Sequence, residues 1–395
     1  MANQISVKGQ ATLSVCHMAG MIDLAALPLW VGTLMRFYGL AAPRAGLIVT
    51  TFLVSVVASS VVVAPLFSRV RHRLLAFLGF AVAAGAFAGA SSLPARADSA
   101  NMMMLLHALS GFGVGASLSV THGMIGRSAN PHRLFGIANV AMAILAILMF
   151  ATLPTLISRL GGPTVFRAFA ITMSVAAIVA LLFFPEMHAK EPVPRERGAS
   201  LARQPLPKAA WFTIGTITCL TLNQSVVFAF VERIGASRGF GDAAVQQVLI
   251  VTGLINLAPG LLAVLLQKRL PALGVGIAGP ILQALLALCI TAASTYAFFA
   301  LPSIFYVALV IFTTTFMFGL LTEVDTSGRA VAATPAMMMI GSALGPALGG
   351  GIVAWVGYPG LGWVVLLIAC AAVSLMLLTR RDMARAAAPA SAKAA

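Results

Sequence analysis

The stretch PEMHAKEPVPRERGASLARQPLPK, residues 185–208, is the longest polar segment of a 395-residue chain that is 60% hydrophobic and only 9% charged. Its proline and charge content is typical of a linker between folded units. On both sides the sequence consists of apolar runs of about 20 residues, the length that an α-helix needs to cross a hydrocarbon core. Six runs precede the segment and six follow it, so the sequence predicts an integral membrane protein with two six-helix halves.

The predicted fold class is therefore all-α, with twelve transmembrane helices in two six-helix bundles. The N-terminal bundle covers residues 1–184, the linker 185–208 and the C-terminal bundle 209–382, and residues 383–395 are expected to form a disordered cytoplasmic tail. The first run is longer than the about 7–15 apolar residues of a signal peptide and is expected to remain in the protein. The twelve runs lie at residues 11–36, 45–67, 74–94, 101–126, 134–157, 165–185, 209–232, 243–267, 272–295, 301–322, 329–356 and 360–379.

The basic residues predict the orientation of these helices. The formal net charge is +15, and the basic residues are distributed among the loops instead of forming one patch, so no nucleic-acid partner is expected. If the N-terminus is cytoplasmic and the runs alternate in direction, 18 of the 25 Lys and Arg residues lie on the cytoplasmic side. The positive-inside rule then predicts that both termini are cytoplasmic.

The reactive side chains give no sign of catalysis. Each of the four cysteines lies in a separate apolar run, where it is expected to pack as a small hydrophobic residue. The six histidines show no metal-binding spacing, and the chain has neither a Walker loop nor a catalytic Ser–His–Asp constellation. The sequence therefore predicts that the protein is not an enzyme, holds no metal and needs no cofactor.

Two loops in corresponding positions of the two halves are similar. RSANPHRLFGIANVAM, residues 127–142, follows the fourth run, and VDTSGRAVAATPAM, residues 324–337, follows the tenth. Each contains an arginine that opens the next helix, Arg133 or Arg329, with a methionine nine residues later. This spacing favours a parallel duplication of a six-helix unit.

The six-plus-six arrangement with its long basic central loop resembles the major facilitator superfamily of secondary transporters. The loop APLFSRVRHRLL, residues 64–75, is similar to the superfamily's G-x-L-a-D-r-x-G-r-k signature at Leu66, Arg69 and Arg73, and it departs from the signature at Ser68 and Arg71. Asp325 can also pair with an arginine one helical turn later. The gate residues expected on this basis are Arg69, Arg73, Arg133, Asp325 and Arg329.

The segment AGMIDLAALPLW, residues 19–30, places Asp23 in the middle of the first run. A carboxylate at the centre of a span costs about 2.5–3.5 kcal/mol on insertion scales, so such residues usually face a bundle interior or a pathway. Asp23 could carry a coupling proton or bind a cationic solute, or it could pair with His107 or an amide to hold helices together. The resemblance favours proton coupling, with Asp23 and His107 as the candidate residues.

In the superfamily the first, fourth, seventh and tenth helices line the central cavity, and here these runs carry most of the mid-depth polar groups. With one deep acid and no deep Lys or Arg, the sequence favours a neutral, aromatic or cationic solute. In the eleventh run, Gly341 and Gly345 have the small-xxx-small spacing that predicts close helix packing. The residues expected to bind the solute are Trp30, Ser110, Asn223, Gln224, Phe228, Tyr306 and Thr313.

The resemblance implies a monomeric secondary transporter of a bacterial inner membrane. Its expected partners are a small organic solute, protons and the lipid bilayer, and its expected mechanism is alternating access. A membrane sensor or receptor that does not transport, built on the same fold, is the alternative. The absence of an added soluble domain from the sequence favours the transporter.

Overall fold

The computed structural model describes residues 5–186, 206–325, 330 and 334–391, so most of the predicted linker lies outside the described residues. Regular secondary structure in the described residues is helical throughout, which confirms the all-α fold. The N-terminal half contains α1 (Val7–Gly20), α2 (Ile22–Arg36), α3 (Ala42–Val63), η1 (Ala64–Arg69), α4 (His72–Ser92), η2 (Ala97–Ser99), α5 (Ala100–Gly126), α6 (Pro131–Leu160) and α7 (Pro163–Phe183). The C-terminal half contains α9 (Lys208–Phe228), α10 (Val231–Ser237), α11 (Asp242–Ile255), α12 (Pro259–Leu266), α13 (Ala272–Ala292), α14 (Tyr296–Val324) and α16 (Thr334–Ser391).

The twelve predicted runs all correspond to helices. Among the described residues, ten helices are long and apolar enough to cross a membrane. The longest of them, Met337–Arg385, covers the last two predicted runs, and the shorter helices α11 and α12 cover the eighth. Large apolar side chains on the outside of the molecule include Leu105, Phe112, Ile171, Leu261, Trp355 and Leu367. Such an apolar exterior suits lipid, and the chain is a multi-pass membrane protein.

Two boundaries in the C-terminal half differ from the prediction. Residues 256–258 divide the predicted run 243–267 into α11 and α12, because Pro259 has no N–H with which to continue the helical hydrogen bonds. The predicted runs 329–356 and 360–379 instead form one helical element, α16, with a kink at Gly357. Gly357 has a φ of 72°, a conformation that glycine adopts without steric cost.

The C-terminal tail also differs from the prediction. Residues 383–395 were expected to be disordered, but α16 continues to Ser391. The segment ARAAA at residues 384–388 explains the difference, because alanine and arginine are strong helix formers. Residues 392–395 lie outside the described residues.

The first helix of each half is broken. In the N-terminal half, Met21 separates α1 from α2 with a φ of −97° and a ψ of 32°. In the C-terminal half, the α9 helix ends at Phe228 and α10 begins at Val231. An acidic side chain stands in the first turn after each break, Asp23 in α2 and Glu232 in α10. Carboxylates are favoured there, because the first N–H groups of a helix lack helical partners.

The two halves meet through α3 with α16, α6 with α11 and α2 with α10. The approach of α3 to α16 depends on glycine. A Cβ atom at Gly46 would overlap the backbone carbonyl of Pro346, and one at Gly350 would overlap that of Ala42. Thr50 Oγ1 also accepts a hydrogen bond of 3.1 Å from the backbone N–H of Ala347.

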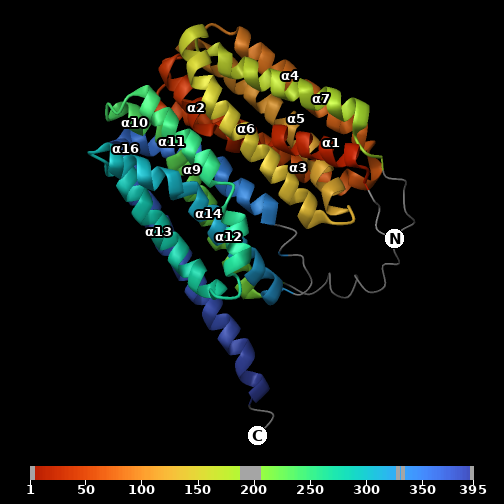
Figure 1. Ribbon diagram of the computed structural model, residues 1–395, viewed down its shortest axis with the longest axis vertical. Coiled ribbons are helices and arrows are strands. Elements are labelled where there is room, and N and C mark those ends of the chain that lie inside the picture. The colour runs from red at the N-terminus through yellow and green to blue at the C-terminus, as the bar shows by residue number, and fades with distance from the viewer. Residues whose placement is uncertain (1–4, 187–205, 326–329, 331–333, 392–395) are drawn as a thin grey trace.

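These contacts lie toward one end of the molecule. We call it the closed end; it is the end at which α2 finishes at Arg36 and α11 starts at Asp242. The opposite end, where α7 finishes and α9 starts, is the linker end. In Figure 1 the ribbons of the two halves lie together around α2, α10 and α11 and diverge toward the opposite end.

Candidate functional site

The break in the first helix positions Asp23. Its side chain is buried, with 7% exposure, in the first turn of α2 and two residues after Met21. Gly20 permits this arrangement, because a Cβ atom there would overlap the side chain of Leu118 on α5. The structure therefore places a carboxylate at a helix N-terminus inside the N-terminal bundle, a position that stabilises negative charge through the helix dipole.

Trp30 and His107 contact each other directly. The Trp30 indole N–H donates a hydrogen bond of 3.0 Å to His107 Nε2, and His107 Nδ1 lies 2.7 Å from the carbonyl oxygen of Met103. Because Nε2 accepts and the carbonyl can only accept, the geometry assigns the ring proton to Nδ1 and a neutral imidazole. Both side chains have 0% exposure. Their rings pack with those of Phe52, Phe87, Phe166 and Phe169.

Four of the other expected solute-binding residues lie in helix-packing positions. Ser110 Oγ donates to the carbonyl oxygen of His107, and Thr313 Oγ1 donates to that of Leu309. The Tyr306 hydroxyl donates a hydrogen bond of 2.7 Å to the Asn223 carbonyl oxygen. Ser110, Asn223 and Thr313 have 0% exposure and Tyr306 has 1%, so these groups lie inside the two bundles.

Gln224 and Phe228 complete the set on α9. Phe228 is buried, with 5% exposure. Gln224 is only half-buried and makes no hydrogen bond to the described residues. Among the expected solute-binding residues, Gln224 is therefore the side chain with the most capacity left for a ligand.

The expected gate residues are distributed over the linker end. The Arg73 guanidinium donates to the carbonyl oxygen of Phe184 at the end of α7 and lies 3.3 Å from Glu186 Oε1. Arg69 is exposed. Asp325 Oδ2 accepts a hydrogen bond of 2.8 Å from the backbone N–H of Ala330.

Of the two loop arginines in corresponding positions of the halves, the structure describes only one. Arg133 is exposed in the first turn of α6, and its backbone N–H donates to Asn130 Oδ1, which caps that helix. Arg329 lies outside the described residues. The expected packing of the eleventh run is confirmed, because Cβ atoms at Gly341 and Gly345 would overlap Thr221 and Ser225 on α9.

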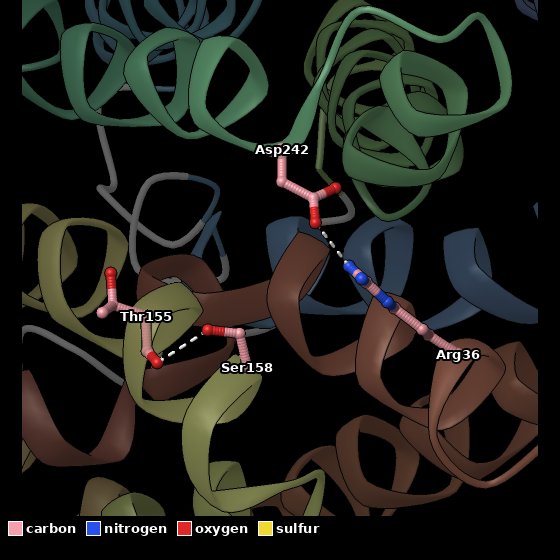
Figure 2. A network of polar contacts seen from close by, with 4 residues as sticks. All are labelled: Arg36, Thr155, Ser158 and Asp242. Carbon is pink, nitrogen blue, oxygen red and sulfur yellow. Dashed lines mark hydrogen bonds and ion pairs between the residues drawn. The ribbon is translucent and has the colours of Figure 1, made fainter.

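The closed end contains an ion pair that sequence analysis did not identify. Arg36 Nη1 lies 2.9 Å from Asp242 Oδ2 and joins the end of α2 to the start of α11, as Figure 2 shows. Nearby, Gln246 Nε2 donates to the carbonyl oxygens of Phe150 and Ala151 on α6, at 3.2 and 2.9 Å. These three hydrogen bonds cross between the halves.

A pocket of about 190 Å³, with both polar and apolar lining residues, lies beside this ion pair. Thr155 and Ser158 line it from α6, joined by a 2.8 Å hydrogen bond from Ser158 Oγ to the Thr155 carbonyl (Figure 2). Glu232 of α10 also lines the pocket.

Burial raises the pKa of Tyr38, in the loop after α2, to about 12, so its hydroxyl remains neutral at physiological pH.

Two further polar arrangements were missed. Glu232 was not among the residues singled out from the sequence, yet its Oε2 atom is buried and has no hydrogen-bond partner among the described residues. In the N-terminal half, His17 Nδ1 lies 3.0 Å from His122 Nε2, and His17 Nε2 lies 3.3 Å from Asn139 Oδ1. No spacing signal could reveal this second group, because His17 is more than a hundred residues from both His122 and Asn139.

Metal binding finds no support in the described part of the chain, where no three His, Cys, Asp or Glu side chains are grouped to hold an ion. The structure instead offers buried carboxylates at two helix breaks and a polar contact between two helical halves. Discontinuous helices of this kind form solute and ion sites in secondary transporters.

Solved transporters share this fold. A D-xylose–proton symporter matches with a TM-score of 0.72 at 15% identity, covering 94% of this chain and 96% of the symporter. The nucleoside transporter NupG, as a point mutant, matches with 0.70 at 13%, covering 94% and 99%. A bacterial homologue of the human lysosomal transporter Spinster, in an inward-facing and unoccupied conformation, matches with 0.68 at 12%, covering 95% and 97%.

The family follows from the sequence match. No curated protein sequence matches the chain significantly. The family model described as Major Facilitator Superfamily, however, matches residues 13–324, which is more than half of the chain. The chain therefore belongs to the major facilitator superfamily, and it is a secondary transporter and not an enzyme.

Proposed function

We propose that this transporter moves a small organic solute by alternating access, coupled to protons, as a monomer in a bacterial inner membrane. The observation that carries the proposal is the uneven contact between the halves. The Arg36–Asp242 ion pair and the hydrogen bonds from Gln246 to α6 lie at the closed end, and the hydrogen bond between Thr50 and Ala347 lies further along α3. A rocking motion about the middle of the molecule would break these contacts and open the opposite route.

The orientation follows from the basic loops. The linker end is the cytoplasmic end, since the positive-inside rule places the Lys- and Arg-rich loops and both termini there. The closed end is then periplasmic, and its contacts would seal the periplasmic side in this state.

Asp23 is the proposed coupling residue. Its carboxyl group is buried beside a helix break, where a small movement of α1 relative to α2 would change its exposure to water. Desolvation and hydration favour opposite protonation states of a carboxyl group, so such a movement links proton binding to conformation. His107 remains the second candidate, although both of its ring nitrogens already have partners.

Gln224 is the first residue to test for solute binding, because it is only half-buried and its side-chain amide can still donate and accept hydrogen bonds. Phe228 follows it by four residues on the same helix and can supply an apolar contact. Trp30, Ser110, Asn223, Tyr306 and Thr313 are proposed to shape the walls behind this position.

The test is solute flux into proteoliposomes that contain the purified protein. Sugars, nucleosides and aromatic or cationic amines are offered with and without an imposed pH gradient, and protein-free liposomes provide the background. We expect one class to accumulate when the gradient is present and to exchange when it is absent. Saturable ligand binding with no flux for any class would instead favour the sensor.

A further inference from the structure

Glu232 occupies a position between the two halves at the closed end. It stands in the first turn of α10, and its carboxylate lies against Gly32 of α2, on the other half. A Cβ atom at position 32 would overlap Glu232 Oε2, so the carboxyl group occupies the space that the missing side chain of Gly32 leaves. The carboxyl group is therefore part of the contact between α2 and α10.

The carboxyl group is poorly solvated in this state. The Glu232 side chain is half-buried, and its Oε2 atom is fully buried with no hydrogen-bond partner among the described residues. An ionised carboxylate that loses water without gaining hydrogen bonds is costly, whereas the protonated group avoids most of that cost. The closed contact thus suits the neutral acid better than the anion.

The charged groups around Glu232 are few. Arg36 and Asp242 are already paired with each other, whereas Arg233 interacts electrostatically with Glu232 and its buried Nε atom has no hydrogen-bond partner among the described residues. Arg238, at the end of α10, donates to the carbonyl oxygen of Thr291 on α13, a helix that has no charged residue. Arg36 and Arg238 therefore have other partners, and no described residue donates a hydrogen bond to Glu232 Oε2.

We infer that Glu232 is a proton site of the closed end, separate from Asp23. Glu232 holds a proton while α2 and α10 are in contact. When the two helices separate and water reaches the carboxyl group through the pocket, Glu232 transfers the proton to water. The inference rests on the alternating access proposed above. Because the closed state binds one proton more than the open state, raising the pH favours opening, by at most about tenfold per pH unit.

The experiment measures the closed end directly, without a solute. Spin labels are attached at Arg159→Cys and Ser237→Cys, at the closed ends of α6 and α10, and the distance between them is measured in lipid nanodiscs from about pH 5 to about pH 8. We expect the longer-distance population to increase with pH. Glu232→Gln should remove this pH dependence and keep the shorter distance dominant.

Asp242→Asn is the matched control, since it removes the other acid of the pocket. It should increase the open population while the pH dependence remains. If the distance still depends on pH in Glu232→Gln, the inference is overturned. It is also overturned if the labelled protein without further substitutions shows only the short distance at every pH. The distance measurement and the flux measurement can give separate answers. If the distances change with pH as expected but the protein shows no solute flux, the transport proposal is contradicted and the Glu232 proton site is still supported.

Discussion

Asp23 is buried in an apolar run, where an ionisable side chain is costly and usually serves a function. Asp23→Asn keeps the shape and most of the hydrogen-bonding capacity but cannot release a proton. We expect this variant to insert and to exchange solute, and to lose accumulation driven by a pH gradient. Uptake in proteoliposomes, with and without the gradient, measures both activities.

Asp98→Asn is the control for this variant, because Asp98 is exposed in the loop before α5. It should accumulate solute as the unmodified protein does. If Asp23→Asn accumulated solute at the unmodified rate, Asp23 would be a packing residue, and the coupling proton would have to be carried elsewhere.

Sequence analysis found buried polar residues more readily than their partners. Asp23, Trp30 and His107 stood out because polar or aromatic groups are rare in apolar runs, but the hydrogen bond between Trp30 and His107 depends on the register of α2 against α5. The register of one helix against another cannot be read from a single sequence. Glu232 was missed for a similar reason, since the close approach of Gly32 comes from the other half.

At the scale of the helices, the pairing of α3 with α16 rests on glycine. A methyl group at Gly350 would overlap the backbone of Ala42, whereas one at Gly351 would meet nothing within 4 Å. We expect Gly350→Ala to destabilise the protein by about 1–3 kcal/mol, the usual cost of overpacking. Gly351→Ala, one position further along the same helix, should change stability by less than about 0.5 kcal/mol.

Thermal unfolding of the solubilised protein compares the two variants. Equal melting temperatures would show that α3 and α16 are not in close contact in solution. A lower melting temperature for Gly350→Ala alone would support the packing described here.

The helices themselves were largely predictable, because apolar length alone identifies a membrane span. The departures have local causes: Pro259 divides the eighth run, Gly357 kinks α16, and the alanine-rich tail extends it. The break at Met21 was not predicted, since residues 11–36 form one uninterrupted apolar run. Only the acid that follows the break hinted at a new helix start.

For the whole molecule, the orientation in the membrane is the first property to test. The test uses the single substitutions Asp98→Cys and Arg269→Cys, each in a protein from which the four native cysteines have been removed. Asp98 lies at the closed end and Arg269 at the linker end. An impermeant thiol reagent added to intact cells should label the first and not the second. The reverse pattern would place the linker end outside the cell.

The central claim is that the closed end must open for transport. Cysteines at Arg36→Cys and Asp242→Cys replace the ion pair that joins α2 to α11, and a short reducible thiol cross-linker can then hold the two helices together. Because the original pair is exposed on both sides, its loss alone should cost less than about 1 kcal/mol and leave flux nearly unchanged.

The decisive measurement is solute flux in proteoliposomes before cross-linking, after cross-linking and after reduction. The same reagent applied to each single-cysteine variant controls for chemical modification. We predict that cross-linking stops flux in the double variant and that reduction restores it. Undiminished flux through a fully cross-linked protein would contradict alternating access at this interface.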